Sequence, residues 1–138
     1  MIGLDTNILA RYYIEDENDT EATHQRLAAQ RLIESGKALQ VAKTVLLELE
    51  WVMRGYYRFD PTEITCAFKH LLSLPQVTIE DRDTIEQAIT SFEQGLDFAD
   101  ALHHASYQDC DAMASFDDKK FARRAKRLGM APRVIVPT

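Results

Sequence analysis

Short apolar runs alternate with longer amphipathic segments along the chain, and this alternation most constrains the fold. Residues 2–4 are an apolar run too short for a helix, and Asp5, Thr6 and Asn7 supply capping chemistry for a helix that follows. Further strand-like runs are residues 39–42, 77–80, 112–116 and 133–136. Helical patterns cover residues 20–34, 44–53, 62–74, 83–93, 97–109 and 117–128. The alternation predicts an α/β three-layer sandwich, with a mainly parallel central sheet flanked by helices.

The composition is that of an ordinary globular protein. A chain of 138 residues with 46% hydrophobic and 28% charged residues predicts a single domain, residues 1–138. There is no apolar run long enough for a membrane span and no signal sequence, so we expect a cytoplasmic protein. Cys66 and Cys110 have neither zinc-site nor disulfide spacing, and we interpret both as core thiols. The net charge of −6 argues against a protein that coats nucleic acid.

Four acids occupy suggestive positions on this predicted map. Asp5 ends the first strand and Asp117 ends the fourth, so both belong to the same edge of a parallel sheet. Glu48 lies at the border of the apolar stripe of helix 44–53, which begins at a Thr44 cap, whereas Glu50 points to solvent. Asp100 borders the apolar face of its helix. Each acid also has a structural explanation, as a helix cap, a partner of the helix dipole or a member of an ion pair.

Convergence of these four acids would require a cation. Each close pair of carboxylates repels by about 4 kcal/mol at roughly 4 Å and an effective dielectric constant near 20. Oxygen ligands without a cysteine or histidine cluster favour Mg²⁺ or Mn²⁺ over Zn²⁺, and Mg²⁺ commonly adds substrate phosphate oxygens. These residues therefore predict phosphodiester chemistry. Much of the chain's net negative charge then belongs to the metal site, so it no longer argues against a nucleic-acid substrate.

Four sequence motifs carry a resemblance to a known family. They are Asp5-Thr6-Asn7 after the first strand, Glu48 within Leu-Glu-Leu-Glu-Trp, Asp100 within Asp-Phe-Ala-Asp-Ala-Leu, and Ser115-Phe116-Asp117 after the fourth strand. In these motifs the chain resembles PIN-domain proteins of the VapC toxin type, over essentially its whole length. The resemblance implies a PIN-like sheet in the order 3-2-1-4-5 and a homodimer. It also implies a Mg²⁺- or Mn²⁺-dependent ribonuclease, the toxin of a type II toxin-antitoxin system.

The resemblance assigns roles to individual residues and partners. The implied catalytic and metal-binding acids are Asp5, Glu48, Asp100 and Asp117, and the implied supporting residues are Thr6, Asn7, Ser115 and Asp97. A water activated by metal would attack phosphorus, leaving a 5′-phosphate and a 3′-hydroxyl. A separate antitoxin chain would block the site, form a larger assembly with the toxin and bind operator DNA.

A basic segment follows Asp117. Six cations fall within residues 119–127, and we expect the tentative RNA-binding residues to be Lys119, Lys120, Arg123 and Arg124. A solvated helix exterior is the equal alternative, with Phe121, Ala125 and Leu128 facing inward. His103 and His104 are candidates for a direct role, although the family does not use histidine there. Trp51, Tyr56 and Tyr57 fit core or dimer contacts better than base stacking.

Two other classes of function compete with the nuclease. A phosphatase of the haloacid dehalogenase type also starts with a strand and an aspartate, but it needs a second aspartate where this chain has Asn7. A catalytically silent PIN-like binding module would lack one or more acids, whereas the set of four is complete here. The sequence therefore favours the nuclease.

Overall fold

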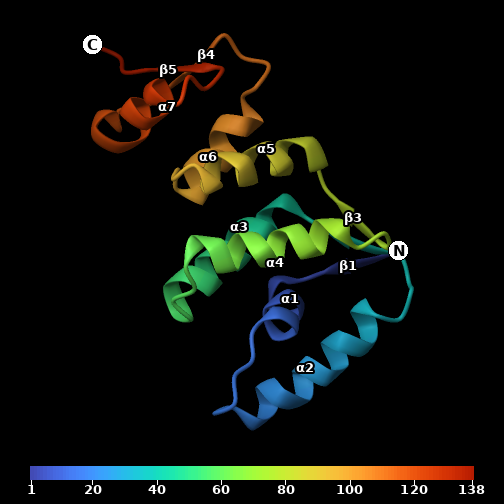
Figure 1. Cartoon of the computed structure of the whole chain (residues 1–138). Helices are drawn as coiled ribbons and strands as arrows, with labels where there is room; N and C mark the ends of the chain where they lie inside the picture. The colour runs from blue at the N-terminus through green and yellow to red at the C-terminus, as the bar shows by residue number, and fades with distance from the viewer. The chain divides into compact units, whose positions relative to one another are not determined.

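The computed structural model describes all residues from 1 to 138, of which 58% are helical. Short parallel strands alternate with helices, as the sequence predicts (Figure 1). The chain forms two compact units, unit 1 (Met1–Arg82) and unit 2 (Asp83–Thr138). No helix combines the length and the apolar character that a membrane span needs.

Unit 1 is built on a three-stranded parallel sheet in the order β3-β2-β1. Its elements are β1 (Ile2–Leu4), α1 (Thr6–Tyr13), α2 (Thr20–Ile33), β2 (Leu39–Val41), α3 (Lys43–Trp51), the π-helical turn η1 (Val52–Tyr56), α4 (Pro61–Ser73) and β3 (Val77–Ile79). In β2 and β3 the first and third residues are buried and the middle one is exposed, which is the alternation of a strand with one covered face. The helices α1 and α2 pack against each other (Figure 1).

The first strand is less buried than its apolar sequence predicts. Leu4 is buried, but Ile2 is 40% exposed and Gly3 is also exposed. Both β1 and β3 are edge strands of the unit 1 sheet. Edge position alone does not explain the exposure of β1, because Val77 and Ile79 of β3 are buried.

Local capping signals locate two helices of unit 1 correctly. The carboxylate of Asp60 accepts a hydrogen bond from the Glu63 backbone N–H, the Glu63 side chain accepts one from the Asp60 N–H, and Pro61 is the first helical residue of α4. At α2, the Asp19 carboxylate accepts from two backbone N–H groups of the first turn. Both signals depend on residues close in sequence, which is why the sequence suffices.

The prediction that Thr44 caps α3 is wrong. The helix begins at Lys43, and its cap residue Ala42 offers no side-chain hydrogen bond. Instead, the carboxylate of Glu80 accepts the Lys43 backbone N–H at 2.9 Å. The cap comes from the residue after β3, on the strand next to β2, so a local reading of the sequence does not find it.

Several side chains predicted inside are exposed. Cys66 and Cys110 are both exposed free thiols, so the expectation of two core thiols is wrong. Leu27 is 48% exposed because it does not lie on the buried face of α2, which is formed by Ala22, Ala29 and Ile33. Trp51 and Tyr56 are 61% and 73% exposed, which rules out a core role for them within the chain.

Unit 2 is built on a two-stranded parallel sheet. Its elements are α5 (Arg82–Glu93, starting at the unit boundary), α6 (Phe98–Ser106), β4 (Ala112–Ala114), the π-helical turn η2 (Asp118–Ala122), α7 (Arg123–Arg127) and β5 (Arg133–Ile135). Met113 of β4 lies opposite Val134 of β5. The expected order 3-2-1-4-5 is therefore matched only in part, as 3-2-1 in one sheet and 4-5 in a second sheet.

The helix predicted over residues 117–128 is divided in two. A π-helical turn precedes α7, and Leu128, predicted to face inward, is 36% exposed. Phe121 and Ala125 are buried as predicted. The segment ends at Gly129, whose φ of +65° is a conformation that glycine adopts without steric cost.

Candidate functional site

Asp5 stands where β1 ends and α1 begins. Its Oδ1 accepts a hydrogen bond from the Thr6 backbone N–H at 2.8 Å, so the carboxylate caps α1. Helix capping is the structural role that the sequence also allowed for this residue. The side chain is exposed, and Asn7 is exposed beside it, whereas Thr6 is buried. The cap uses one oxygen, which leaves the second oxygen of Asp5 available to a ligand.

The burial of the two glutamates of α3 is the reverse of the predicted burial. Glu48 is exposed, and Glu50 is 2% exposed, among the most buried side chains of the chain. The buried line of this segment passes through Leu46, Leu49, Glu50 and Met53, which follow the helical spacing of three and four residues. The prediction that Glu48 is partly buried and Glu50 solvated is therefore wrong.

Glu50 is neutralised by an arginine one turn later. Arg54 Nε donates to Glu50 Oε2 at 2.7 Å and an Arg54 terminal nitrogen donates to Oε1 at 3.4 Å. A buried carboxylate with a guanidinium partner is a structural ion pair, and the spacing of four residues in the sequence was the signal for it. Glu48 remains the glutamate of α3 that is accessible to a ligand.

The carboxyl edge of the unit 1 sheet holds two further acids that the sequence analysis did not select. Glu80 follows β3 and caps α3, and Asp81 pairs with Lys43 Nζ at 3.2 Å. Asp81 has a φ of +53°, a left-handed conformation that aspartate tolerates better than most residues. Both carboxylates already have partners in the fold, so we do not add them to the candidate set. Their position directly after an apolar run was the available signal.

In unit 2, α6 and the end of β4 bring three aspartates together. Asp97 is the N-cap of α6, and its Oδ2 accepts the Asp100 backbone N–H at 3.2 Å. Asp117 is the N-cap of η2, and its Oδ1 accepts the N–H groups of Lys120 and Phe121 at 3.1 and 3.4 Å. The two caps fix the start of both elements.

The electrostatics of Asp100 show that these three carboxylates act on one another. Partial burial raises the pKa of the Asp100 carboxyl, the charges of Asp97 and Asp117 raise it further, and His103 lowers it. Within unit 2 no lysine or arginine forms an ion pair with Asp97, Asp100 or Asp117. The cluster therefore carries negative charge that no lysine or arginine of unit 2 pairs with, and His103 offsets part of it. Two of the four predicted acids, and one predicted supporting acid, lie together.

Ser115 and the two histidines have separate roles. The Ser115 hydroxyl oxygen accepts the Asp117 backbone N–H at 3.1 Å, which places this predicted supporting residue against the predicted ligand. His104 is 3% exposed, its Nε2 donates to the Pro132 carbonyl at 2.6 Å, and its ring packs edge-on against Phe121. His104 thus fastens α6 to the segment before β5. His103 is exposed and belongs to the surroundings of Asp100.

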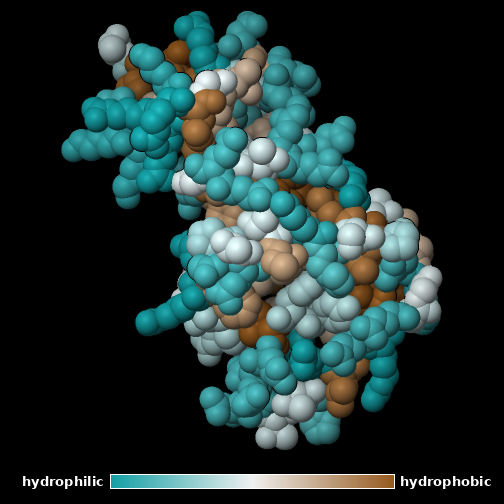
Figure 2. Space-filling model, viewed as in Figure 1, coloured by the Kyte–Doolittle hydropathy of each residue, from teal (hydrophilic) through white to brown (hydrophobic).

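The predicted RNA-binding residues are exposed on η2 and α7. Lys119 and Lys120 have no ion-pair partner within unit 2, Arg123 forms a loose pair with Asp118 at 3.7 Å, and Arg124 donates to the Gly95 carbonyl at 2.6 Å. Arg124 therefore has a structural role that the sequence did not indicate. Hydrophilic residues cover most of the surface around α7 (Figure 2).

The candidate acids suit a hard divalent cation in their chemistry but not in their spacing within a unit. No group of three or more potential ligands within either unit is close enough to hold a metal ion by itself. The chemistry of the Asp97, Asp100 and Asp117 cluster is nevertheless suitable, because all donors are carboxylate oxygens and their mutual repulsion raises the Asp100 pKa. A cation would relieve that repulsion.

The sequence matches the family model of the PIN domain over residues 2–127, a range that includes parts of both units. The chain belongs to the PIN domain family. PIN domains have an α/β fold and are generally metal-dependent nucleases, and the helices and parallel strands of this chain agree with that fold. No curated protein matches the chain in sequence.

Proposed function

We propose that this PIN domain is a Mg²⁺- or Mn²⁺-dependent ribonuclease and the toxin of a type II toxin-antitoxin system. The observation that carries the proposal is the group of aspartates around Asp100, whose negative charge has no lysine or arginine partner in unit 2. The family supplies the nuclease class. The toxin role is supported by the resemblance of the four acidic motifs to VapC-type toxins.

The residues that would hold the metal are Asp5, Glu48, Asp100 and Asp117. A bound divalent ion would supply an activated water and would neutralise charge on the phosphate. The chain's own contribution is positioning: Asp117 is held by Ser115 and by the start of η2, and the Asp97 cap fixes the first turn of α6, which carries Asp100. Because the Asp100 pKa is raised, protons compete with a cation at this carboxylate more strongly than at an ordinary aspartate.

Cleavage of RNA by the purified chain tests the nuclease. We expect cleavage with Mg²⁺ or Mn²⁺, none with EDTA, and a loss of about a hundredfold or more in Asp5→Asn and in Asp100→Asn. Asp109→Asn is the matched control, since this aspartate is exposed in unit 2 outside the cluster. Cleavage in EDTA, or wild-type rates in both active-site variants, would contradict the proposal. Release of phosphate from small phosphoesters without cleavage of RNA would indicate a phosphatase.

The toxin role and its partners need separate tests. We expect expression of the chain to arrest bacterial growth, expression of Asp100→Asn to leave growth unchanged, and a cognate antitoxin chain to restore it. The chain should elute as a homodimer, and it should bind operator DNA only together with the antitoxin. Growth arrest by Asp100→Asn as strong as that by the wild type would show that toxicity does not depend on cleavage.

A further inference from the structure

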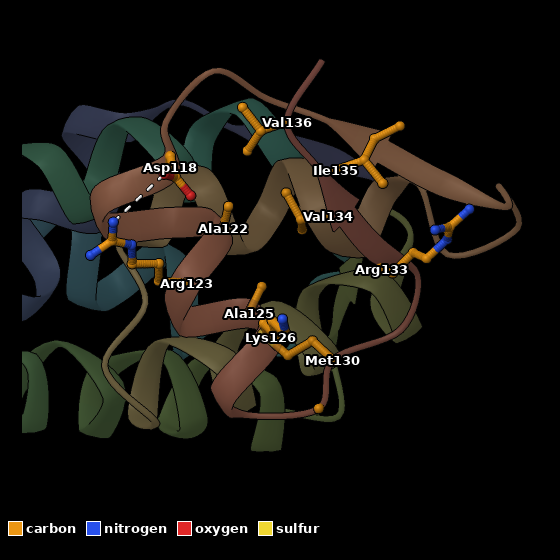
Figure 3. Close-up of a pocket in the computed structure, with 11 residues that line it drawn as sticks. Asp118, Ala122, Arg123, Ala125, Lys126, Met130, Arg133, Val134, Ile135 and Val136 are labelled. Atoms are coloured by element: carbon orange, nitrogen blue, oxygen red, sulfur yellow. Dashed lines mark ion pairs between the residues drawn. The ribbon is translucent and has the colours of Figure 1, made fainter. Parts of the chain in front are cut away.

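A cleft of about 710 Å³ lies within unit 2 between β5 and the basic segment η2–α7. On the helical side it is lined by Ala122 and Ala125, and on the strand side by Val134 and Val136. Ile135 lines the cleft as well, so residues 134–136 all belong to its strand side (Figure 3). These valine, isoleucine and alanine side chains give the cleft an apolar lining.

The rim of the cleft is charged. Arg123 and Lys126 stand on the helical side, both exposed, and Asp118 lies at the end where η2 begins (Figure 3). The ion pair between Arg123 and Asp118 is long, at 3.7 Å, and both side chains are more than half exposed, so water screens it strongly. The rim therefore presents net positive charge above an apolar lining.

This combination matches the two halves of a nucleotide. Phosphates are attracted to clustered lysine and arginine side chains, and the faces of unpaired bases are apolar surfaces that favour contact with apolar side chains. A paired base in a duplex does not expose its face, so the matching polymer is single-stranded. The cleft also begins at Asp118, directly after the candidate metal ligand Asp117.

We propose that the cleft between β5 and η2–α7 binds the single-stranded RNA segment next to the scissile phosphate, with a base against Val134 and Val136 and phosphates on Arg123 and Lys126. This inference rests on the proposed ribonuclease function and adds to it a subsite that holds the base beside the cleavage position. An acidic peptide would satisfy the cations of the rim but would leave the apolar lining without a matching group.

Two matched pairs of variants test the subsite in a binding assay with EDTA, which needs no cleavage. The probe is a short fluorescein-labelled single-stranded RNA. Lys126→Gln should lower the slope of log affinity against log salt by about one, whereas Arg127→Gln, on the same helix but outside the cleft, should not. Val136→Gln should weaken binding about threefold or more, and Leu128→Gln, at an apolar residue of similar exposure outside the cleft, should leave it unchanged.

Photo-crosslinking locates the RNA directly. An RNA with one 4-thiouridine should crosslink to residues 130–136 in the wild-type chain. Equal effects of Lys126→Gln and Arg127→Gln together with equal effects of Val136→Gln and Leu128→Gln, or crosslinks only in unit 1, would overturn the subsite. A poly-glutamate peptide that binds as tightly as the RNA would overturn it too, because the cleft would then recognise charge alone. Failure of the nuclease itself is seen separately, as absence of metal-dependent cleavage.

Discussion

Glu50 in unit 1 and Asp100 in unit 2 are both acids withdrawn from water, and their surroundings are opposite in charge. Glu50 is 2% exposed and is held by the guanidinium of Arg54. Asp100 is partly buried beside Asp97 and Asp117, whose charges raise its pKa. A buried acid with its own counter-charge is complete within the fold, whereas an acid among acids is a candidate ligand for a cation. The comparison separates a structural carboxylate from a candidate functional one.

The largest effect should come from removing one charge of the unit 2 cluster. Asp117→Asn should lower RNA cleavage by about a thousandfold. The variant loses a metal ligand, and with it the charge that neutralises the phosphate. The fold should persist, since asparagine is also a good N-cap. The neighbouring Asp118→Asn, which removes only the loose pair with Arg123, should stay within about threefold of the wild-type rate. Equal losses of cleavage in both variants would show that Asp117 contributes no more to catalysis than Asp118 does.

Removing the counter-charge in unit 1 should affect stability and not chemistry. Arg54→Met leaves the buried Glu50 carboxylate without its partner, and we expect a loss of about 3 kcal/mol in the free energy of unfolding. The double variant Glu50→Leu/Arg54→Met should recover most of the loss, because no buried charge remains. Urea denaturation measures both. A single variant as stable as the wild type would mean that the pair does not anchor α3 and η1.

The anchor of α6 should contribute a smaller amount. His104→Leu keeps an apolar side chain in a buried position but removes the donor to the Pro132 carbonyl, and we expect a loss of about 1–2 kcal/mol in unfolding free energy. His103→Leu, at the neighbouring exposed position, is the control and should change stability little. If the two variants were equally stable, the hydrogen bond of His104 would not be what holds α6 to the chain before β5.

The substitution Asp100→Asn should have the smallest effect, a gain in the stability of the fold. The folded-state pKa of Asp100 lies above the ordinary 3.8, so the folded chain binds this proton more tightly than the unfolded chain. Without metal, stability therefore falls as the pH rises through 3.8 and then through the raised pKa, and the loss is complete at neutral pH. Asp100→Asn avoids this loss. In EDTA at neutral pH its melting temperature should rise by roughly 1–4 °C, small because water screens the site. An unchanged melting temperature with an unchanged pH dependence would contradict the repulsion.

The parts of the fold that follow from local chemistry could be predicted from the sequence. Asp60, Pro61 and Glu63 mark the start of α4, and Gly129 marks the end of α7, because each signal lies within a few residues of the backbone groups it satisfies. The cap of α3 by Glu80 could not be predicted, since it joins residues on neighbouring strands. The alternation of elements also followed from the sequence, and three neighbouring strand pairs of the order implied by the family resemblance are present: 3-2, 2-1 and 4-5.

The candidate site was predicted in part. The proximity of Asp97 to Asp100 follows from their spacing within one helical turn, and Asp117 follows from its place at the end of a parallel strand. The roles of Glu48 and Glu50 could not be assigned, because nearly every position from Val45 to Met53 other than the acids is apolar and periodicity does not select one face. The association of Asp5 and Glu48 with the unit 2 aspartates stays a prediction.

Binding of Mn²⁺ followed by electron paramagnetic resonance tests most directly whether acids from both units serve one ion. We predict one strong site in the wild-type chain, weakened at least about tenfold by Asp5→Asn in unit 1 and equally by Asp100→Asn in unit 2, with Asp109→Asn unchanged. A wild-type chain that binds no Mn²⁺ would contradict the account. So would an Asp5→Asn chain that binds it as tightly as the wild type.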